Sequence, residues 1–306
     1  MLRKSTLIIL ALCLIVGGIG IGVTGAVLGG KTEFVFNGRG WNFIEYTKDD
    51  IEDNREYTKD NLEYKQDYTQ GKLEELGSFK KIDVKSGTVA ITIREGKTYG
   101  IGIDVGSKVE LKYSIRGDTL YVEQDGRRIN NNILGTNDWK KYGGEIIITV
   151  PEGKKLEKTY IELGVGEGKF ENLYTENFKL VVGVADTYIQ GLTADRVNIE
   201  GGVGRIILDE GYLGETDITV GVGSIKVETV LSGDLDIEGG LGDLDVILQG
   251  DEKDYNYEIS RGMGKIRIND ETYKGMDDIN IRNKSDKTID IEAGVGSISI
   301  ETRIDK

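Results

Sequence analysis

From residue 159 onwards, apolar and polar residues follow one pattern that repeats every nineteen residues. Within each repeat the two kinds alternate, as in Thr216-Asp-Ile-Thr-Val and Ser224-Ile-Lys-Val-Glu. Such alternation is typical of a β-strand with one buried face. Each repeat holds two of these stretches on either side of a Gly-x-Gly tripeptide. The pattern therefore predicts two short strands per repeat, joined at a corner.

The corner tripeptide occurs seven times, five times at the regular spacing and twice after insertions of three and thirteen residues. Glycine permits the positive φ, or the close approach of neighbouring backbone, that a repeated sharp corner needs. In the second copy Ala185 replaces one glycine. The predicted structural corner residues are Gly164, Gly166, Gly183, Gly202, Gly204, Gly221, Gly223, Gly240, Gly242, Gly262, Gly264, Gly294 and Gly296.

Three positions are apolar in every copy: three before the first glycine, directly after it, and six after it. The position four after it begins with Gly168 and Thr187 and becomes apolar only in later copies. A fixed period with constant apolar columns is the mark of a solenoid. We therefore predict an all-β chain folded as a β-solenoid, with about nineteen residues and two short strands per coil.

Two functional interpretations of the glycines fail on spacing. A phosphate-binding loop needs a third glycine or Gly-Lys-Ser/Thr between a strand and a helix, and no copy has either. The calcium-binding nonapeptide roll resembles residues 239–245, but Leu244 stands where an aspartate is required and the period is nineteen rather than nine.

Composition narrows the chemistry. The chain has no histidine, and its one cysteine, Cys13, lies in an apolar run, which excludes histidine-based triads, His/Cys zinc sites and an internal disulfide. The net charge of −14 argues against a nucleic-acid partner. One proline among 306 residues suits stacked strands, because proline removes a ladder hydrogen bond. We predict no cofactor, no catalytic residue and no metal ligand.

Acidic residues fill two outward columns ahead of the corner. One column holds Glu162, Glu200, Glu238 and Glu292, and the other holds Asp217, Asp236, Glu258 and Asp290. Stacked like charges are destabilising, so this face is either solvated or neutralised by cations, and we favour solvation because charged outer faces are the norm. Basic residues after the corner are placed to engage an acidic partner: Lys169, Arg205, Lys226, Lys265 and Arg267.

Residues 1–30 predict a short cytoplasmic tip and one transmembrane helix. Ser5 to Gly30 carry no charge over 26 residues, which is about 39 Å of helix against a hydrocarbon core of about 30 Å. Arg3 and Lys4 keep the N-terminus cytoplasmic, so the bulk of the chain is expected outside the cell membrane. A cleaved signal peptide is the alternative, although its apolar region is usually about 7–15 residues. Leu12, before Cys13, argues against lipidation.

Three further segments follow. Residues 31–77 form a polar stalk with eleven-residue repeats such as Glu45-Tyr-Thr-Lys-Asp, which fit either a solvated helix or a partly disordered spacer. Residues 78–158 alternate as strands and are expected to form an N-terminal β cap over the open edge of the first coil. Residues 159–306 hold the coils, and the block 278–306, with the displaced last coil, is expected to close the other end.

The order of Ser78-Phe-Lys-Lys-Ile-Asp-Val, Ile148-Thr-Val-Pro-Glu-Gly and serial Gly-Val-Gly coils resembles the bacterial putative adhesin family, a domain of unknown function common in membrane-anchored envelope proteins. The resemblance covers about residues 78–306. It implies a right-handed β-solenoid on the cell exterior and supplies no catalytic residues.

Two function classes remain. We favour a non-enzymatic, membrane-anchored module that contacts cell-wall polymer, another envelope protein or another copy of itself. The alternative is a polysaccharide-acting β-helix enzyme that uses paired carboxylates. Such an enzyme would place aromatic residues in a concave site, whereas Trp41 and Trp139 lie outside the coils.

Overall fold

The computed structural model describes residues 32–36, 41–45, 72–124, 143–273 and 277–304. Strands β1 (Thr32–Phe36) and β2 (Trp41–Glu45) form an antiparallel pair of their own. Every other strand belongs to one sheet of 18 strands. No helix among the described residues is long and apolar enough to cross a membrane. The predicted span, Cys13, Trp139 and the stalk between 46 and 71 lie outside the described residues.

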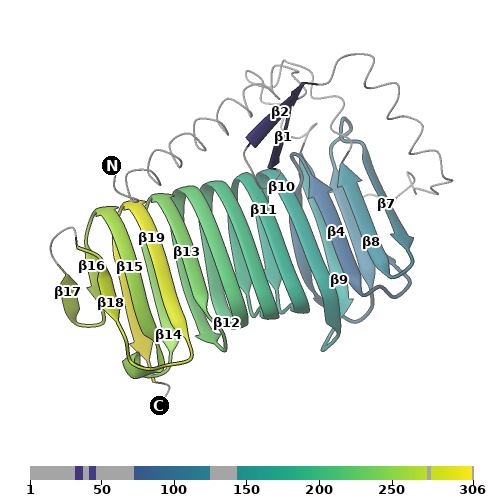
Figure 1. Ribbon diagram of the computed structural model, residues 1–306. Coiled ribbons are helices and arrows are strands. Elements are labelled where there is room, and N and C mark those ends of the chain that lie inside the picture. Colours follow the sequence, from purple (N-terminus) through teal and green to yellow (C-terminus); the bar gives the residue numbers. More distant parts are fainter. Residues whose placement is uncertain (1–31, 37–40, 46–71, 125–142, 274–276, 305–306) are drawn as a thin grey trace.

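The central coils are stacked in parallel and in register. They are β10 (Lys155–Glu171), β11 (Tyr174–Gln190) and β12 (Thr193–Leu231), which contains two coils. Residues nineteen apart are neighbours, so Ile161 pairs with Leu180 and Leu180 with Ile199. These strands pass through the corner unbroken, so each predicted pair of short strands is here one bent strand. The all-β prediction and the β-solenoid are confirmed (Figure 1).

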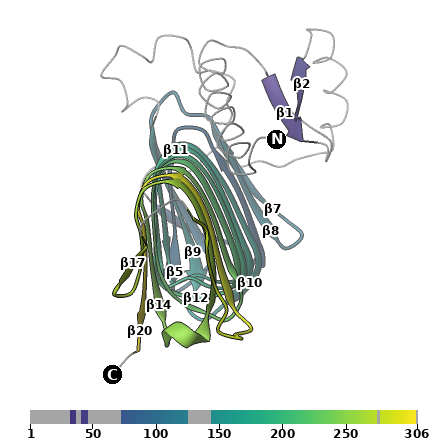
Figure 2. The ribbon, with the colours of Figure 1, turned by 60° about the vertical axis from the view of Figure 1, so that its left-hand side comes forward.

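The hydrophobic core lies between two flat faces of the stack, which meet at a rounded edge (Figure 2). Two columns are almost completely buried, with each side chain at most 1% exposed in every copy. One lies three positions before the first glycine, and the other lies six positions after it. These residues are Ile161, Leu180, Ile199, Ile218, Ile237, Ile259, Ile291, Phe170, Ile189, Leu208, Val227, Val246, Ile268 and Ile300. Thr187, in the less regular column, is buried with a hydroxyl that has no hydrogen-bond partner.

The N-terminal cap continues the coils before closing them. Strands β4 (Lys81–Ser86) and β5 (Ala90–Gly96) pair with β10, and β8 (Thr119–Gln124) and β9 (Gly144–Pro151) form the next coil outward. Antiparallel strands β6 (Gly100–Val105) and β7 (Leu111–Arg116) then cover β9 and β8. Strand β3 (Leu73–Glu75) adds to β6 and begins before the predicted boundary at 78. The Tyr113 hydroxyl donates to Glu74 at 2.6 Å across the end of the core.

The C-terminal coils do not stack in sequence order. Their strands are β13 (Leu235–Leu241), β14 (Leu244–Gln249), β15 (Asn256–Met263), β16 (Ile266–Ile268), β19 (Thr288–Val295) and β20 (Ile298–Arg303). Ile291 of β19 pairs with Ile237 of β13 on one side and Ile259 of β15 on the other. The prediction that block 278–306 closes this end holds only for residues 279–281, because the coil of β19 and β20 lies one position inside the stack (Figure 1).

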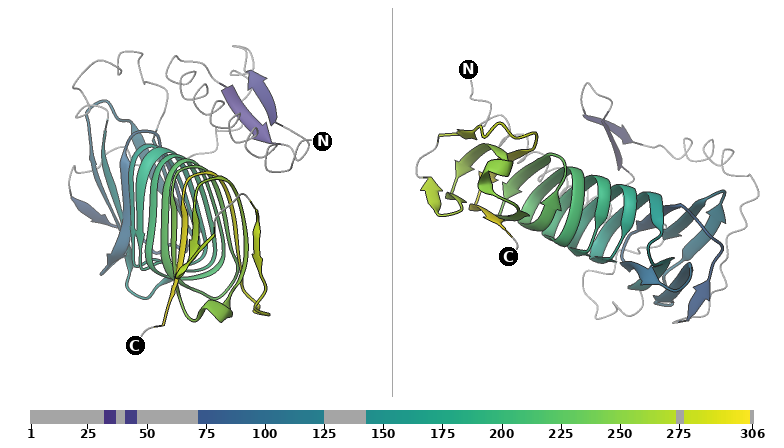
Figure 3. Two further views of the ribbon diagram at one scale, coloured as in Figure 1. Left: turned by 90° about the vertical axis from the view of Figure 1, so that its left-hand side faces the viewer. Right: turned by 90° about the horizontal axis from the view of Figure 1, so that it is seen from below.

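Antiparallel strands close the C-terminal end instead. Strand β17 (Glu271–Tyr273) pairs with β16, and β18 (Ile279–Ile281) pairs with β15 (Figure 3). The physical reason lies in the two insertions. The first contains a 3₁₀ turn, η3 (Glu252–Asp254), which lets the chain step over one coil position, and the second contains β17 and β18.

A local network holds the returning chain beside this turn. The Asn283 side-chain amide donates to the Tyr255 carbonyl at 2.8 Å, and the Asn256 amide donates to the Ser285 carbonyl at 2.8 Å. The Ser285 hydroxyl donates to the Asp254 carbonyl at 2.5 Å. These bonds satisfy backbone carbonyls that the sheet leaves unpaired, and they fix where β19 starts.

Candidate interaction surface

The second glycine of each corner tripeptide has a backbone conformation that other residues rarely adopt. Its φ lies between 139° and 150° at Gly204, Gly223, Gly242, Gly264 and Gly296, and is 145° at Gly166. A Cβ atom at Gly223 would also lie 1.7 Å from the carbonyl oxygen of Gly204 in the neighbouring coil. Both the turn and the stacking therefore require glycine here.

The first glycine is needed for close approach alone. A Cβ atom at Gly202 would lie 2.4 Å from the carbonyl oxygen of Gly183, and Gly164, Gly183, Gly240 and Gly294 have the same contact at 2.2 to 2.5 Å. Gly221 and Gly262 hold the same position in their own coils. Ala185, which replaces a second glycine, is not among the residues with positive φ, and it is buried. The corner thus tolerates one exception by changing its backbone.

The residue between the two glycines points away from the core. This column forms the apolar ridge, which in spatial order consists of Val165, Val184, Val203, Val222, Leu241, Val295 and Met263. Six of the seven are 36% to 62% exposed. With strands about 4.8 Å apart, six spacings give a ridge about 29 Å long. A continuous exposed apolar strip of this kind marks a site of interaction.

The sequence carried a signal for this exposure that the column analysis missed. The middle column is apolar in every copy, as the two core columns are. Its residues, however, lie between two glycines at a convex corner, where the strand turns and the side chain is carried to the outside. Apolar character alone does not separate a core column from an exposed ridge.

A row of polar residues runs along one flank of the ridge, three positions after the first glycine. In spatial order the flanking row is Glu167, Asp186, Arg205, Ser224, Asp243, Ser297 and Lys265. Asp186 accepts a hydrogen bond from the Arg205 backbone N–H at 3.0 Å, and Asp243 accepts one from the Ser297 N–H at 2.9 Å. These two carboxylates therefore tie adjacent coils together beside the corner.

The predicted acidic columns lie on the flat face ahead of the corner. Asp217, Asp236, Asp290 and Glu258 are successive neighbours in the ladder. The pKa of Asp236 is raised, mainly by desolvation and to a smaller extent by the nearby carboxylates of Asp290 and Asp217. The pKa of Asp290 is raised as well, again mainly by desolvation and then by three nearby glutamates. In the part of the chain that the structure describes, no group of three or more carboxylates is arranged to hold a metal ion.

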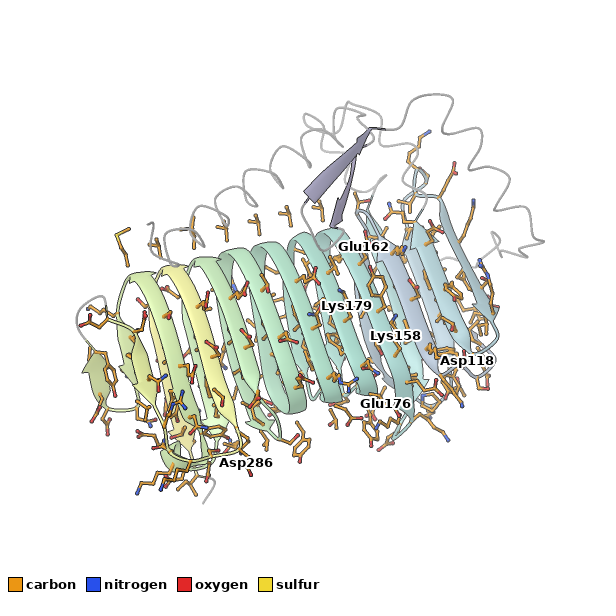
Figure 4. The ribbon with its side chains drawn as sticks, viewed as in Figure 1. Asp118, Lys158, Glu162, Glu176, Lys179 and Asp286 are labelled. Atoms are coloured by element: carbon orange, nitrogen blue, oxygen red, sulfur yellow. The ribbon has the colours of Figure 1, made fainter. Side chains whose placement is uncertain are left out.

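Two glutamates on this face have basic partners. Lys179, which is labelled in Figure 4, lies 2.8 Å from Glu200, and Arg282 lies 3.3 Å from Glu258. Asp236 and Asp290 lie between these two pairs in the ladder. Such exposed pairs contribute little to stability.

Three of the predicted basic residues after the corner also have partners. Lys169 lies 3.1 Å from Glu167, and Lys226 lies 2.9 Å from Glu228. The hydrogen bond that Lys226 donates to Glu228 is the main reason why the pKa of Lys226 is raised. Arg267 donates to the Ser299 hydroxyl at 3.0 Å. These contacts link side chains along one face, and Arg205 and Lys265 belong to the flanking row.

Two hollows lie at the ends of the stack. One, of about 340 Å³, is lined by Leu73, Glu74, Ile101 and Tyr113 among others, and the second, of about 520 Å³, includes Glu252, Arg267, Asn269 and Glu301. In the second, Arg303 lowers the pKa of Glu301. Among the described residues, Asp236 and Asp290 are the carboxyls with a raised pKa, and they lie on the flat face rather than in either of these hollows.

Residues 79–278 match the model of a family described as Toastrack DUF4097. Similar solved structures include a putative cell adhesion protein from Clostridium sporogenes, at 16% identity and a TM-score of 0.29, which covers 76% of this chain and 98% of that chain. Another is a putative adhesin from Bacteroides fragilis, at 14% identity and a TM-score of 0.34, which covers 75% of this chain and 95% of that chain. No curated protein matches the sequence. The family match confirms the resemblance drawn from the motifs.

Proposed function

Because this chain belongs to the Toastrack DUF4097 family, we propose that it is a non-enzymatic interaction module held outside the cell membrane by its N-terminal apolar segment. The observation that carries this proposal is the apolar ridge. It repeats one outward-pointing apolar side chain on each of seven adjacent coils, and six of the seven are exposed. The linear array suits contact with another elongated surface.

The scaffold supports a binding role because it is stiff. The coils between β4 and β16 share one ladder and one continuous core, so the ridge residues keep a fixed spacing. A preorganised surface loses little conformational entropy when it binds. The antiparallel strands at both ends cover edges that would otherwise add further strands.

The location outside the membrane rests on the sequence. Ser5 to Gly30 have the length and apolarity of a span, and Arg3 and Lys4 favour a cytoplasmic N-terminus. Residues 31 to 71 then separate the span from the cap. This order gives a right-handed solenoid, as the family resemblance implies, on a spacer above the membrane, where the ridge can contact cell-wall polymer or envelope proteins.

Protease accessibility of the full chain tests the location. A protease added to intact cells stripped of wall should remove everything beyond Lys31 and leave a membrane-bound stub. A soluble form that begins near Val27 would indicate a cleaved signal peptide. Protection of the whole chain until the cells are permeabilised would overturn the proposed location.

A matched pair of variants tests the surface. Val203, on the ridge, is 39% exposed, and Val230, away from the ridge, is 38% exposed. Chemical cross-linking of the full chain in its membrane should give adducts that Val203→Asp removes and Val230→Asp retains. Equal adduct yields from the two variants would show that the ridge is not the contact surface.

A further inference from the structure

We propose that the apolar ridge is the seam of an antiparallel homodimer, in which two copies meet ridge to ridge. This inference rests on the proposed function and names the partner of that surface as a second copy of the chain. The two-fold axis is perpendicular to the stack and passes beside Val222, the middle member of the ridge. This axis places the flanking row of one copy beside the flanking row of the second copy, and the two rows run in opposite directions.

The flanking row has a charge sequence that suits this reversal. From β10 to β16 its charges are negative, negative, positive, neutral, negative, neutral and positive. Reversal about Ser224 places Glu167 opposite Lys265, and Arg205 opposite Asp243, of the second copy. Asp186 then faces Ser297. Each contact occurs twice because of the symmetry, and no like charges meet along this row.

A parallel dimer has less of this complementarity. With the two-fold axis along the stack, the flanking row would meet the row two positions before the first glycine in the same coils. Glu167 would then face Glu162, Asp243 would face Glu238, and only Arg205 would face an opposite charge, at Glu200. Because like charges brought together at a seam disfavour an arrangement, these contacts select the antiparallel arrangement.

The antiparallel arrangement contains one opposed pair of like charges on the other flank. Glu200 faces Glu238 of the second copy. Lys179 lies 2.8 Å from Glu200 within the same copy, so a positive charge is already beside this contact. The repulsion there is reduced, as it is at Glu167 in the parallel dimer, where Lys169 lies 3.1 Å away in the same copy. The parallel dimer still has two different contacts between like charges, whereas the antiparallel dimer has one.

The ridge side chains also match in reverse order. Val222 of one copy meets Val222 of the second copy, and Val203 meets Leu241 of the second copy. Val165, at one end of the ridge, meets Met263, at the opposite end of the ridge of the second copy. A narrow strip of this kind buries less than the roughly 800 Å² per partner of a standard interface. The dimer is therefore weak in dilute solution, and a shared membrane raises the effective concentration of the copies.

Disulfide trapping of the full chain in its membrane tests the seam and its direction. In a Cys13→Ser background, which removes the only native thiol, Val222→Cys should cross-link to itself on mild oxidation. Val165→Cys alone should not, because its two copies lie about 29 Å apart along the seam. The double variant Val165→Cys, Met263→Cys should cross-link. Val230→Cys is the exposed control away from the ridge.

We expect at least a fivefold greater dimer yield from Val222→Cys than from Val230→Cys. Cross-linking of Val165→Cys alone to the same extent as Val222→Cys would overturn the antiparallel arrangement, and no excess of Val222→Cys over the control would overturn the dimer. Labelling by a membrane-impermeant maleimide separates the two proposals. If Val222→Cys is labelled on wall-stripped cells but forms no dimer, the location stands and the seam fails. If labelling needs permeabilised cells, the location fails and the dimer yield still decides the seam.

A charge exchange tests the flanking row. Lys265→Glu, in the Val222→Cys background, should lower the dimer yield severalfold because Glu167 of the second copy then faces a glutamate. Adding Glu167→Lys should restore the yield. Equal yields from the single and double variants would contradict the proposed pairing.

Discussion

Two alanine substitutions at equivalent corners separate the backbone strain of the second glycine from its contact with the next coil. Gly166 and Gly223 have nearly the same φ, 145° and 150°. The nearest atom to a Cβ at Gly166 is the Ala90 nitrogen, at 3.9 Å, whereas at Gly223 it is the Gly204 carbonyl oxygen, at 1.7 Å. The first substitution therefore adds strain alone, and the second adds strain and a steric clash.

The expected magnitudes differ accordingly. An alanine held in a glycine-only backbone region costs about 1–3 kcal/mol, which is the whole effect expected at Gly166. At Gly223 the neighbouring backbone must also move, and overpacking adds about 1–3 kcal/mol or more. We expect Gly223→Ala to lower the free energy of unfolding by about 3–5 kcal/mol. At about 2–4 °C per kcal/mol for a domain of this size, that is a fall of roughly 6–20 °C in Tm.

Thermal and urea unfolding of the full chain, followed by circular dichroism, measures both variants. Gly153→Ala is the control for positive φ in an open turn, since a Cβ there meets nothing within 4 Å. Equal losses for Gly166→Ala and Gly223→Ala would refute the steric part of the reasoning. A loss at Gly223 no larger than at Gly153 would refute the assignment of the corner.

Three further outcomes follow from the core and the acidic face. Burial and Asp290 raise the pKa of Asp236, so the folded state favours the protonated carboxyl; Asp236→Asn should have a higher Tm than the wild type at pH 7, and this advantage should disappear as the pH falls below the ordinary carboxyl pKa. A constant difference across that range would contradict the titration. Thr187→Val should stabilise by about 1 kcal/mol in urea unfolding, because it removes a buried hydroxyl without a partner; destabilisation would mean that the hydroxyl is satisfied. Ile291→Ala should cost about 2–5 kcal/mol, as much as Ile218→Ala, since both are enclosed by coils on two sides, and a much smaller cost at Ile291 would contradict its interior position.

The sequence by itself determined the coil. Alternation reports which residues are buried because a strand side chain points either into the core or out of it. The columns of Ile161 and Phe170 are therefore readable without coordinates, and both are buried in every copy. The corner glycines are readable for the same local reason, since a turn that is stacked on itself leaves no room for a Cβ atom at positions such as Gly202.

Only the tertiary structure decided which coils are neighbours and which apolar column is exposed. All copies present the same core columns to the coils above and below, so the coil of Ile291 fits equally well at the end of the stack or inside it. The connecting turn at η3 and the antiparallel strands β17 and β18 fix its place. Likewise, Val222 and Ile218 are both aliphatic, and only the bend of the backbone between them sends one outward and the other into the core.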